Sequence, residues 1–135
     1  MKYRLSIRSL EKLIGVHPDL VRVVKRAIEI TEQDFMVIEG VRTLERQKHL
    51  FKQGKSKTMN SRHLEGKAVD LCPYPANSDF DGDGIPNVHD WDQYYPIAKA
   101  MKQAAEELDV PIVWGGDWKT FKDGPHFELD RGVYP

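Results

Sequence analysis

Two short segments of the sequence hold residue types that bind metal ions. His63 and Asp70 stand seven positions apart within residues 61–71, and His126 lies within residues 123–129. Imidazole nitrogens and carboxylate oxygens are common ligands of zinc, and three protein ligands leave a fourth position for water. We therefore predict His63, Asp70 and His126 as the ligands of an open zinc site.

Strand geometry explains how these side chains could meet. Residues 67–71 and 126–129 alternate between two kinds of side chain, so residues two positions apart share a face. Asp70 can then face a site while its apolar neighbours face the core. His126 shares its face with Glu128, which we expect to orient a ligand from behind.

Asp123 precedes His126 by three residues, across a Gly-Pro pair. Zinc lowers the pKa of a bound water toward about 7, and a nearby carboxylate can take the proton of that water. We expect Asp123 to be this base and later to protonate a leaving amine. Structural interpretations also exist, with His126 as a hydrogen-bonded core histidine and Asp123 as a turn residue.

The rest of the pattern predicts an α+β fold. Apolar spacing together with Pro, Thr and Gly signals predicts helices over residues 6–15, 18–31, 43–53 and 96–108. Strand patterns occupy residues 35–39, 67–71, 111–114 and 126–129. We expect the helices to pack on one face of a small, mostly antiparallel sheet. Residues 1–135 would form one domain, with a Pro-, Asp-, Asn- and Gly-rich loop inserted at about 73–92.

Composition excludes several classes of function. The net charge of −1 gives no overall attraction to nucleic acid, and no apolar run could span or anchor in a membrane. Cys72 is the only cysteine, which excludes an internal disulfide and a zinc site built from several thiolates. The basic residues between 42 and 57 indicate a solvated helix face, with a surface for an anionic polymer such as cell wall as the alternative.

The two metal-binding segments together resemble a known family. The patterns are Ser61-x-His63-x-x-Gly66-x-Ala68-x-Asp70 and Asp123-x-x-His126-Phe127-Glu128. They are similar to those of the M15 zinc peptidases, and within that family to phage endolysins that are L-alanyl-D-glutamate peptidases. The segment around Arg42 and residues 114–118 add to the likeness, which runs from about residue 34 to residue 129. The resemblance implies the LAS/hedgehog-type zinc peptidase fold.

By position, the resemblance implies zinc on His63, Asp70 and His126, with Asp123 as the general base. Arg42 would hold the substrate or the developing oxyanion, and Ser61 would form a hydrogen bond near the site. The implied reaction is hydrolysis of the L-alanyl–D-glutamate bond in the peptidoglycan stem peptide, which causes host cell lysis.

Two other functions stay open from the sequence. One is a D-Ala-D-Ala carboxypeptidase or dipeptidase on the same fold, although those enzymes typically have Glu at the position of Asp123. The other is a non-catalytic module that binds zinc or calcium. For the endolysin interpretation we expect a monomer that is made in the host cytoplasm, because the first residues form no apolar signal segment. Release by a holin would let it act on the wall in the periplasm.

A second metal is suggested within residues 79–90. Oxygen ligands fall at the spacing of an EF-hand calcium loop, with Gly84 at its sixth position. The predicted calcium ligands are Asp79, Asp81, Asp83, Ile85 through its carbonyl, Asn87 and Asp90. Position 12 is Asp90 rather than the usual Glu, and an acidic solvated turn is the alternative.

Overall fold

The computed structural model describes residues 2–56, 61–75, 91–120 and 122–135. In chain order the elements are α1 (Ile7–Lys12), α2 (Pro18–Ile30), β1 (Phe35–Glu39), α3 (Leu44–Lys52), η1 (Arg62–Glu65), β2 (Ala68–Pro73), α4 (Trp91–Leu108), β3 (Ile112–Trp114), η3 (Gly115–Asp117) and β4 (His126–Leu129). The four strands match the four that the sequence predicts, to within two residues at each end.

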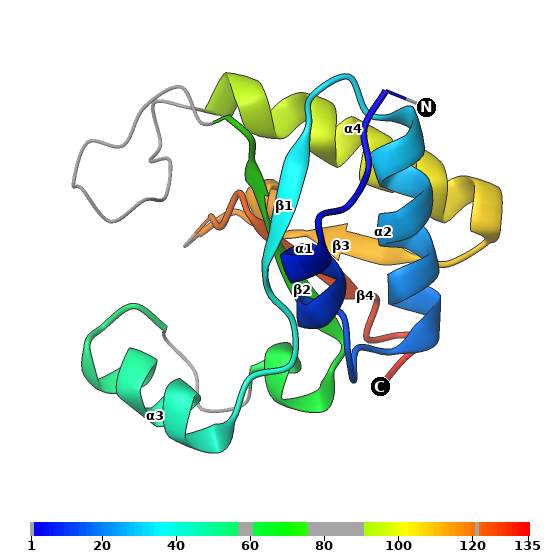
Figure 1. Ribbon diagram of the computed structural model, residues 1–135. Helices are drawn as coiled ribbons and strands as arrows, with labels where there is room; N and C mark the ends of the chain where they lie inside the picture. The colour runs from blue at the N-terminus through cyan, green and yellow to red at the C-terminus, as the bar shows by residue number, and fades with distance from the viewer. Residues whose placement is uncertain (1, 57–60, 76–90, 121) are drawn as a thin grey trace.

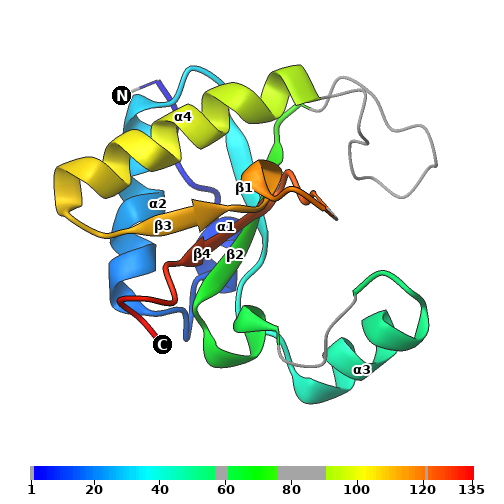
Figure 2. The same cartoon turned by 180° about the vertical axis from the view of Figure 1, so that it is seen from behind.

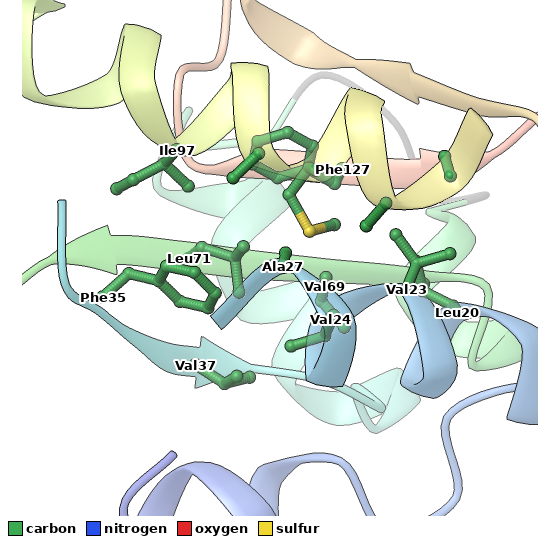
Figure 3. Packing of buried hydrophobic residues seen from close by; sticks show 14 of the residues in the cluster. Leu20, Val23, Val24, Ala27, Phe35, Val37, Val69, Leu71, Ile97 and Phe127 are labelled. Carbon is green, nitrogen blue, oxygen red and sulfur yellow. The ribbon is translucent and has the colours of Figure 1, made fainter. Parts of the chain in front are cut away.

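The strands form one antiparallel sheet in the order β1-β2-β4-β3. Helices α2 and α4 pack against each other and lie across the sheet (Figure 1). Val69, Leu71 and Phe127 are completely buried between the sheet and these helices (Figure 3). This arrangement confirms the predicted α+β class, with helices covering an antiparallel sheet.

The other face of β2 and β4 is left for polar side chains. Strand alternation turns Asp70, His126 and Glu128 away from the core that holds Val69 and Phe127. Helix α3 lies at the opposite end of the molecule from α4, near the short helix η1 (Figure 2). It therefore takes no part in the α2–α4 layer. Its residues Arg46 and Leu50 line one wall of the cavity that the polar face also lines.

Two predicted helices differ from the structure. The helix expected over residues 6–15, with Ile7, Leu10, Leu13 and Ile14 as its apolar face, ends at Lys12. Leu13 is buried in the core as predicted, but Ile7 and Ile14 are 77% and 75% exposed, so the rest of the predicted apolar face was wrong. Helix α4 begins at Trp91, five residues before the predicted start, and Pro96 lies inside it. Burial of Tyr94, 3% exposed, favours this extra turn despite the backbone hydrogen bond that a proline lacks.

In the part of the chain that the structure describes, no helix is both long enough and apolar enough to cross a membrane. The predicted calcium loop, residues 79–90, lies outside the described residues.

Candidate metal and catalytic site

Strand pairing brings the predicted ligands together from distant parts of the sequence. In the β2–β4 register, Asp70 lies directly opposite His126. His63 comes from η1, where the Ser61 hydroxyl accepts a hydrogen bond from the His63 backbone N–H at 3.2 Å. Gly66 ends η1 in the left-handed conformation, with φ of 70°, and returns the chain into β2.

The three side chains meet at one carboxylate oxygen. Asp70 Oδ1 lies 3.2 Å from His63 Nε2 and 3.4 Å from His126 Nδ1. One ligand atom from each of the three residues lies within 4.8 Å of the other two. His63 is 2% exposed and His126 is 6% exposed, so both imidazole rings are largely shielded from solvent.

Hydrogen bonds on the outer side fix both imidazole rings. His63 Nδ1 donates to the Gly40 carbonyl oxygen at 2.8 Å, because a carbonyl can only accept. A carboxylate oxygen also only accepts, so His126 Nε2 donates to Glu128 Oε1 at 2.9 Å. In the neutral rings His63 Nε2 and His126 Nδ1 are therefore lone-pair acceptors, and both face Asp70.

Three acceptor atoms that face one another fit a cation. Among the described residues, His63 Nε2 and Asp70 Oδ1 are buried and lack a hydrogen-bond partner. Such groups cost free energy unless something binds them. Two imidazole nitrogens and one carboxylate oxygen suit zinc, whose ligating histidines typically donate their other N–H to a carboxylate or carbonyl.

The site perturbs the acidity of its own residues. In the metal-free site, burial alone would raise the pKa of Asp70, but the His126 and His63 imidazoles beside it hold that pKa well below its usual range. In the same state burial lowers the pKa of His126, yet the adjacent Asp70 and Glu128 carboxylates and the charge of Asp123 raise it to about 9. Both shifts favour a site that holds positive charge among carboxylates.

Asp123 lines the same cavity as the three ligand-type residues. Burial and the Asp70 charge raise the pKa of Asp123 to about 6, against the opposing effects of His126, His63 and Arg42. Its backbone is fixed on both sides, since Asp123 N donates to the Gly115 carbonyl at 3.0 Å and its carbonyl accepts from His126 N at 3.2 Å. A carboxyl group with a pKa near neutrality can both accept and donate a proton.

Arg42 is held rigidly at the edge of the cluster. Its guanidinium binds both carboxylate oxygens of Glu39, at 2.7 and 2.8 Å, and donates to Gln47 Oε1 at 2.7 Å. Its Nη2 lies 3.7 Å from Asp70 Oδ2, and its side chain is 8% exposed. Ser61 Oγ lies 3.5 Å from Arg42 Nη1, so Ser61 borders the site as well as capping η1.

Glu128 connects the metal site to Arg62, which is buried. Its Oε2 lies 3.6 Å from Arg62 Nε, and Arg62 is 3% exposed. Arg62 also donates to the carbonyl oxygens of Leu129 at 3.0 Å and Tyr134 at 2.7 Å. The pKa of Glu128 is lowered, because hydrogen bonding to His126 and the nearby positive charges outweigh the opposing effect of its burial.

A cavity of about 520 Å³ contains all the described residues to which the sequence assigns a role at the zinc site. They are Arg42, Ser61, His63, Asp70, Asp123, His126 and Glu128. Sequence reasoning missed three neighbours. Glu39 precedes Arg42 by three residues, a spacing that could have suggested the ion pair. Trp118, whose ring centroid lies 5.1 Å from that of His126, belongs to the 114–118 segment that carries the family resemblance, but it was assigned no role at the site. Arg62 gave no such signal because tertiary contacts alone bring it here.

Comparison with known proteins identifies a family for this chain. Residues 1–134 match the phage L-alanyl-D-glutamate peptidase family. The L-alanyl-D-glutamate peptidase of Escherichia phage T5 is 31% identical over 99% of this chain and 94% of its own length. The peptidoglycan L-alanyl-D-glutamate endopeptidase CwlK of Bacillus subtilis is 34% identical over 71% of this chain and 60% of its own length.

A solved structure is similar throughout. The Serratia marcescens L-Ala D-Glu endopeptidase ChiX is 44% identical, with a TM-score of 0.85 over 99% of this chain and 96% of that one. Family match, relatives and structure agree with the resemblance that the sequence motifs indicated. The chain belongs to the phage L-alanyl-D-glutamate peptidase family.

Proposed function

We propose that this protein is a zinc-dependent peptidoglycan endopeptidase that hydrolyses the bond between L-alanine and D-glutamate in the stem peptide. The observation that carries the proposal is the cluster of His63, Asp70 and His126, whose facing acceptor atoms lie in a cavity that also holds Asp123. Membership of the family and the names of its relatives supply the substrate class.

In this proposal His63 Nε2, Asp70 and His126 Nδ1 would hold a zinc ion. When bound, zinc would supply a Lewis acid and lower the pKa of a water molecule toward about 7. Asp123 takes the proton of the attacking water and passes it to the nitrogen of the departing D-glutamate. Arg42, fixed by Glu39 and Gln47, presents its positive charge where the carbonyl oxygen becomes negative.

The two alternatives are less well supported. A D-Ala-D-Ala carboxypeptidase or dipeptidase is not what the family or the described relatives are named for. A non-catalytic binding module has no use for a half-buried carboxyl group whose pKa is raised to about 6 beside the ligand cluster. The endopeptidase therefore accounts for more of the site.

A digest of purified Gram-negative peptidoglycan tests the proposal, with products identified by mass spectrometry. The samples are wild type, zinc-stripped protein, Asp123→Ala and the control Asp117→Ala. Asp117 is 55% exposed on its side chain and pairs with Lys102 outside the cavity. We expect new D-glutamate amino termini from wild type and Asp117→Ala only.

Other products would change the assignment. Free D-alanine or its dipeptide would move the protein to the carboxypeptidase or dipeptidase branch. No cleavage by folded, zinc-loaded wild type would favour the binding module. Full activity of Asp123→Ala would remove Asp123 as the base while leaving the reaction in place.

Three further parts of the proposal rest on the sequence. Calcium would bind the loop of residues 79–90, and a calcium-dependent rise in melting temperature that Asp81→Ala and Asp83→Ala abolish would support it. The protein would act as a monomer and as a single domain, which sedimentation and limited proteolysis test. Peptidoglycan would be reached through a holin, so lysis should require a holin when the protein is expressed in the cytoplasm.

A further inference from the structure

The candidate active site holds more positive charges than its own carboxylates neutralise. Among the described residues, five cations line the 520 Å³ cavity: Arg42, Arg46, Lys55, Arg62 and Arg131. Four carboxylates of the described residues line it as well: Glu39, Asp70, Asp123 and Glu128. A cation that the protein already holds through several hydrogen bonds can act only at a fixed point, as Arg42 does. A cation without such partners can turn toward a carboxylate of the substrate.

Two of the cations are committed to the protein itself. Arg42 binds both oxygens of Glu39 and also Gln47. Arg62 is buried and donates to two backbone carbonyls, with Glu65 Oε2 at 3.3 Å. Neither guanidinium could turn to a new anion without breaking several hydrogen bonds.

Arg46 and Lys55 are not committed in this way. Arg46 Nε lies 3.8 Å from Glu39 Oε1, an oxygen that Arg42 already binds at 2.7 Å. The Arg46 side chain is 54% exposed. Lys55 is exposed and has no ion-pair or hydrogen-bond partner for its ammonium group among the described residues. These two cations stand on the same wall, at α3 and the turn that follows it.

Backbone and side-chain hydrogen bonds fix the turn that carries Lys55. A left-handed Gly54, with φ of 73°, follows the end of helix α3, and Lys55 N donates to the Leu50 carbonyl at 3.0 Å. Gln47 is completely buried and donates to Ser56 Oγ at 2.8 Å while accepting from Arg42. The turn that carries Lys55 is therefore tied to the same side chain that steadies Arg42.

A neighbouring cavity has a lining of the opposite charge. This second cavity, of about 450 Å³, shares Trp118, Glu128 and Arg131 with the first. Among the described residues its lining includes the carboxylates of Glu128 and Asp130 and one cation, Arg131, whose Nε lies 3.4 Å from Glu128 Oε2. An anionic group would be repelled on this side and attracted on the α3 side.

The proposed substrate has an anionic group to place. D-glutamate has two carboxyl groups, and whichever one continues the peptide, the other stays a free carboxylate. Arginine and lysine are the side chains that bind carboxylates by charge-assisted hydrogen bonds. We propose that Arg46 and Lys55 form the subsite that binds the free carboxylate of this D-glutamate; the inference rests on the proposed function.

The test compares two N-acylated L-alanyl-D-glutamyl peptides. In one the free carboxylate of glutamate is kept, and in the other it is a primary amide. The variants are Arg46→Gln, Lys55→Gln and the double variant. Lys48→Gln and Lys52→Gln are matched controls, because they remove the same charge from the same helix but do not line the cavity.

We expect wild type to prefer the carboxylate peptide by about tenfold or more in kcat/KM, as one or two charge-assisted hydrogen bonds allow. Each single variant should lose several-fold on the carboxylate peptide and little on the amide, and the double variant should lose the preference. Since both side chains are exposed, the preference should also shrink as ionic strength rises. The control variants should keep it.

Several results would overturn the subsite. Equal cleavage of both peptides by wild type would do so while leaving the proposed function intact, as would equal losses on both peptides in the variants. Loss of preference in Lys48→Gln or Lys52→Gln would point to the overall charge of α3 instead. A second pair of peptides carries a diamino acid after the glutamate, and so has a carboxylate further along the stem. If a preference for charge is seen only when that residue is present, the two cations bind its carboxylate and not that of the glutamate. Cleavage of neither peptide, with peptidoglycan also intact, would remove the function and the subsite together.

Discussion

At the scale of single residues, the Arg42 guanidinium is held in one position by several hydrogen bonds. A guanidinium is planar and offers several donors, so one side chain can bind both oxygens of Glu39 and the Gln47 amide at once. The anchoring groups come from β1 and α3, which are two separate elements. The result is a positive charge near Asp70 that does not need to reorganise during a reaction.

Arg42→Lys should therefore lower activity although it conserves the charge. A lysine ammonium cannot bind Glu39 through two donors and Gln47 through a third in the same geometry. We expect a loss of about 100-fold in kcat, the size seen when one oxyanion donor is removed, with zinc content unchanged. Steady-state kinetics and metal analysis measure both. Activity within twofold of wild type would show that position 42 needs only charge.

Glu128→Gln should weaken zinc binding. The amide oxygen can still accept from His126 Nε2, but it has no charge to strengthen the imidazole as a ligand. Changing a partner of this kind typically costs about 10- to 100-fold in metal affinity. Competition with a chelating dye measures the affinity directly. Glu107→Gln, at an exposed ion pair with Arg26, is the control that should bind zinc like wild type.

At the scale of elements, the antiparallel pair β2–β4 and two tight segments position the site. The register sets Asp70 against His126, and η1 and the loop before β4 bring in His63 and Asp123. Close backbone approach holds the second of these segments. A Cβ atom at Gly115 would collide with the Asp123 backbone carbonyl and lie 3.0 Å from His126 Cβ.

Gly115→Ala should consequently disturb catalysis as well as stability. The added methyl group must push Asp123 or His126 aside, and overpacking of this kind costs roughly 1–3 kcal/mol of unfolding free energy. Gly54→Ala is the control, because its φ of 73° strains an alanine while nothing lies within 4 Å of the new Cβ. Both variants should melt earlier, but at a temperature where both are folded only Gly115→Ala should lose most activity on the amide peptide, whose cleavage does not depend on the turn of Gly54 and Lys55.

The reactivity of the Cys72 thiol measures whether β2 stays packed in the sheet. The thiol is 2% exposed, and burial raises its pKa to about 11. A raised pKa keeps the thiol protonated at pH 8, where a cysteine in the unfolded chain would be partly ionised, and the thiolate is the reactive form. We expect a thiol reagent to label Cys72 at pH 8 only in denaturant. Rapid labelling of the native protein would show that β2 opens.

The sequence predicted these elements well where local signals and tertiary packing agree. Pro18 opens α2, Thr43 caps α3 by accepting from Arg46 N, and Gly66 turns the chain into β2. The prediction was wrong where packing decides. In α1 the buried residue is Ser9, whose hydroxyl accepts from Val37 N at 3.0 Å, a partner that helical periodicity cannot reveal. Pro96 suggested a helix start, but it lies inside α4.

The candidate site follows the same division. Strand alternation and the spacing of the motifs were enough to bring His63, Asp70 and His126 into one hypothesis before their geometry was known. The charges around them were not predictable in this way. Arg62 adjoins His63 in sequence but contacts Glu128, Leu129 and the last turn of the chain, so its burial depends on the completed fold.

At the scale of the whole molecule, the two faces of one sheet have different tasks. Helices α2 and α4 bury the apolar face and supply most of the core (Figure 3). The polar side chains of the other face line a cavity. The facing acceptor atoms come from η1, β2 and β4, so they meet only in the folded chain. A cation that binds them must therefore favour the folded state over the unfolded one.

Zinc removal should lower the melting temperature, and this prediction separates a bound metal from an idle cluster. A ligand present at about 100 times its Kd adds about 2.7 kcal/mol to the stability of the state that binds it. In the chelated protein the buried Asp70 and His63 atoms lose their cation and have no hydrogen-bond partner among the described residues to replace it.

Thermal unfolding with zinc and with a chelator should differ by several degrees in wild type. Asp70→Asn, nearly the same in size, should show little difference, because zinc loses its charged ligand. Equal melting temperatures in wild type under both conditions, with zinc binding verified by metal analysis, would mean that the ion binds without coupling to the fold.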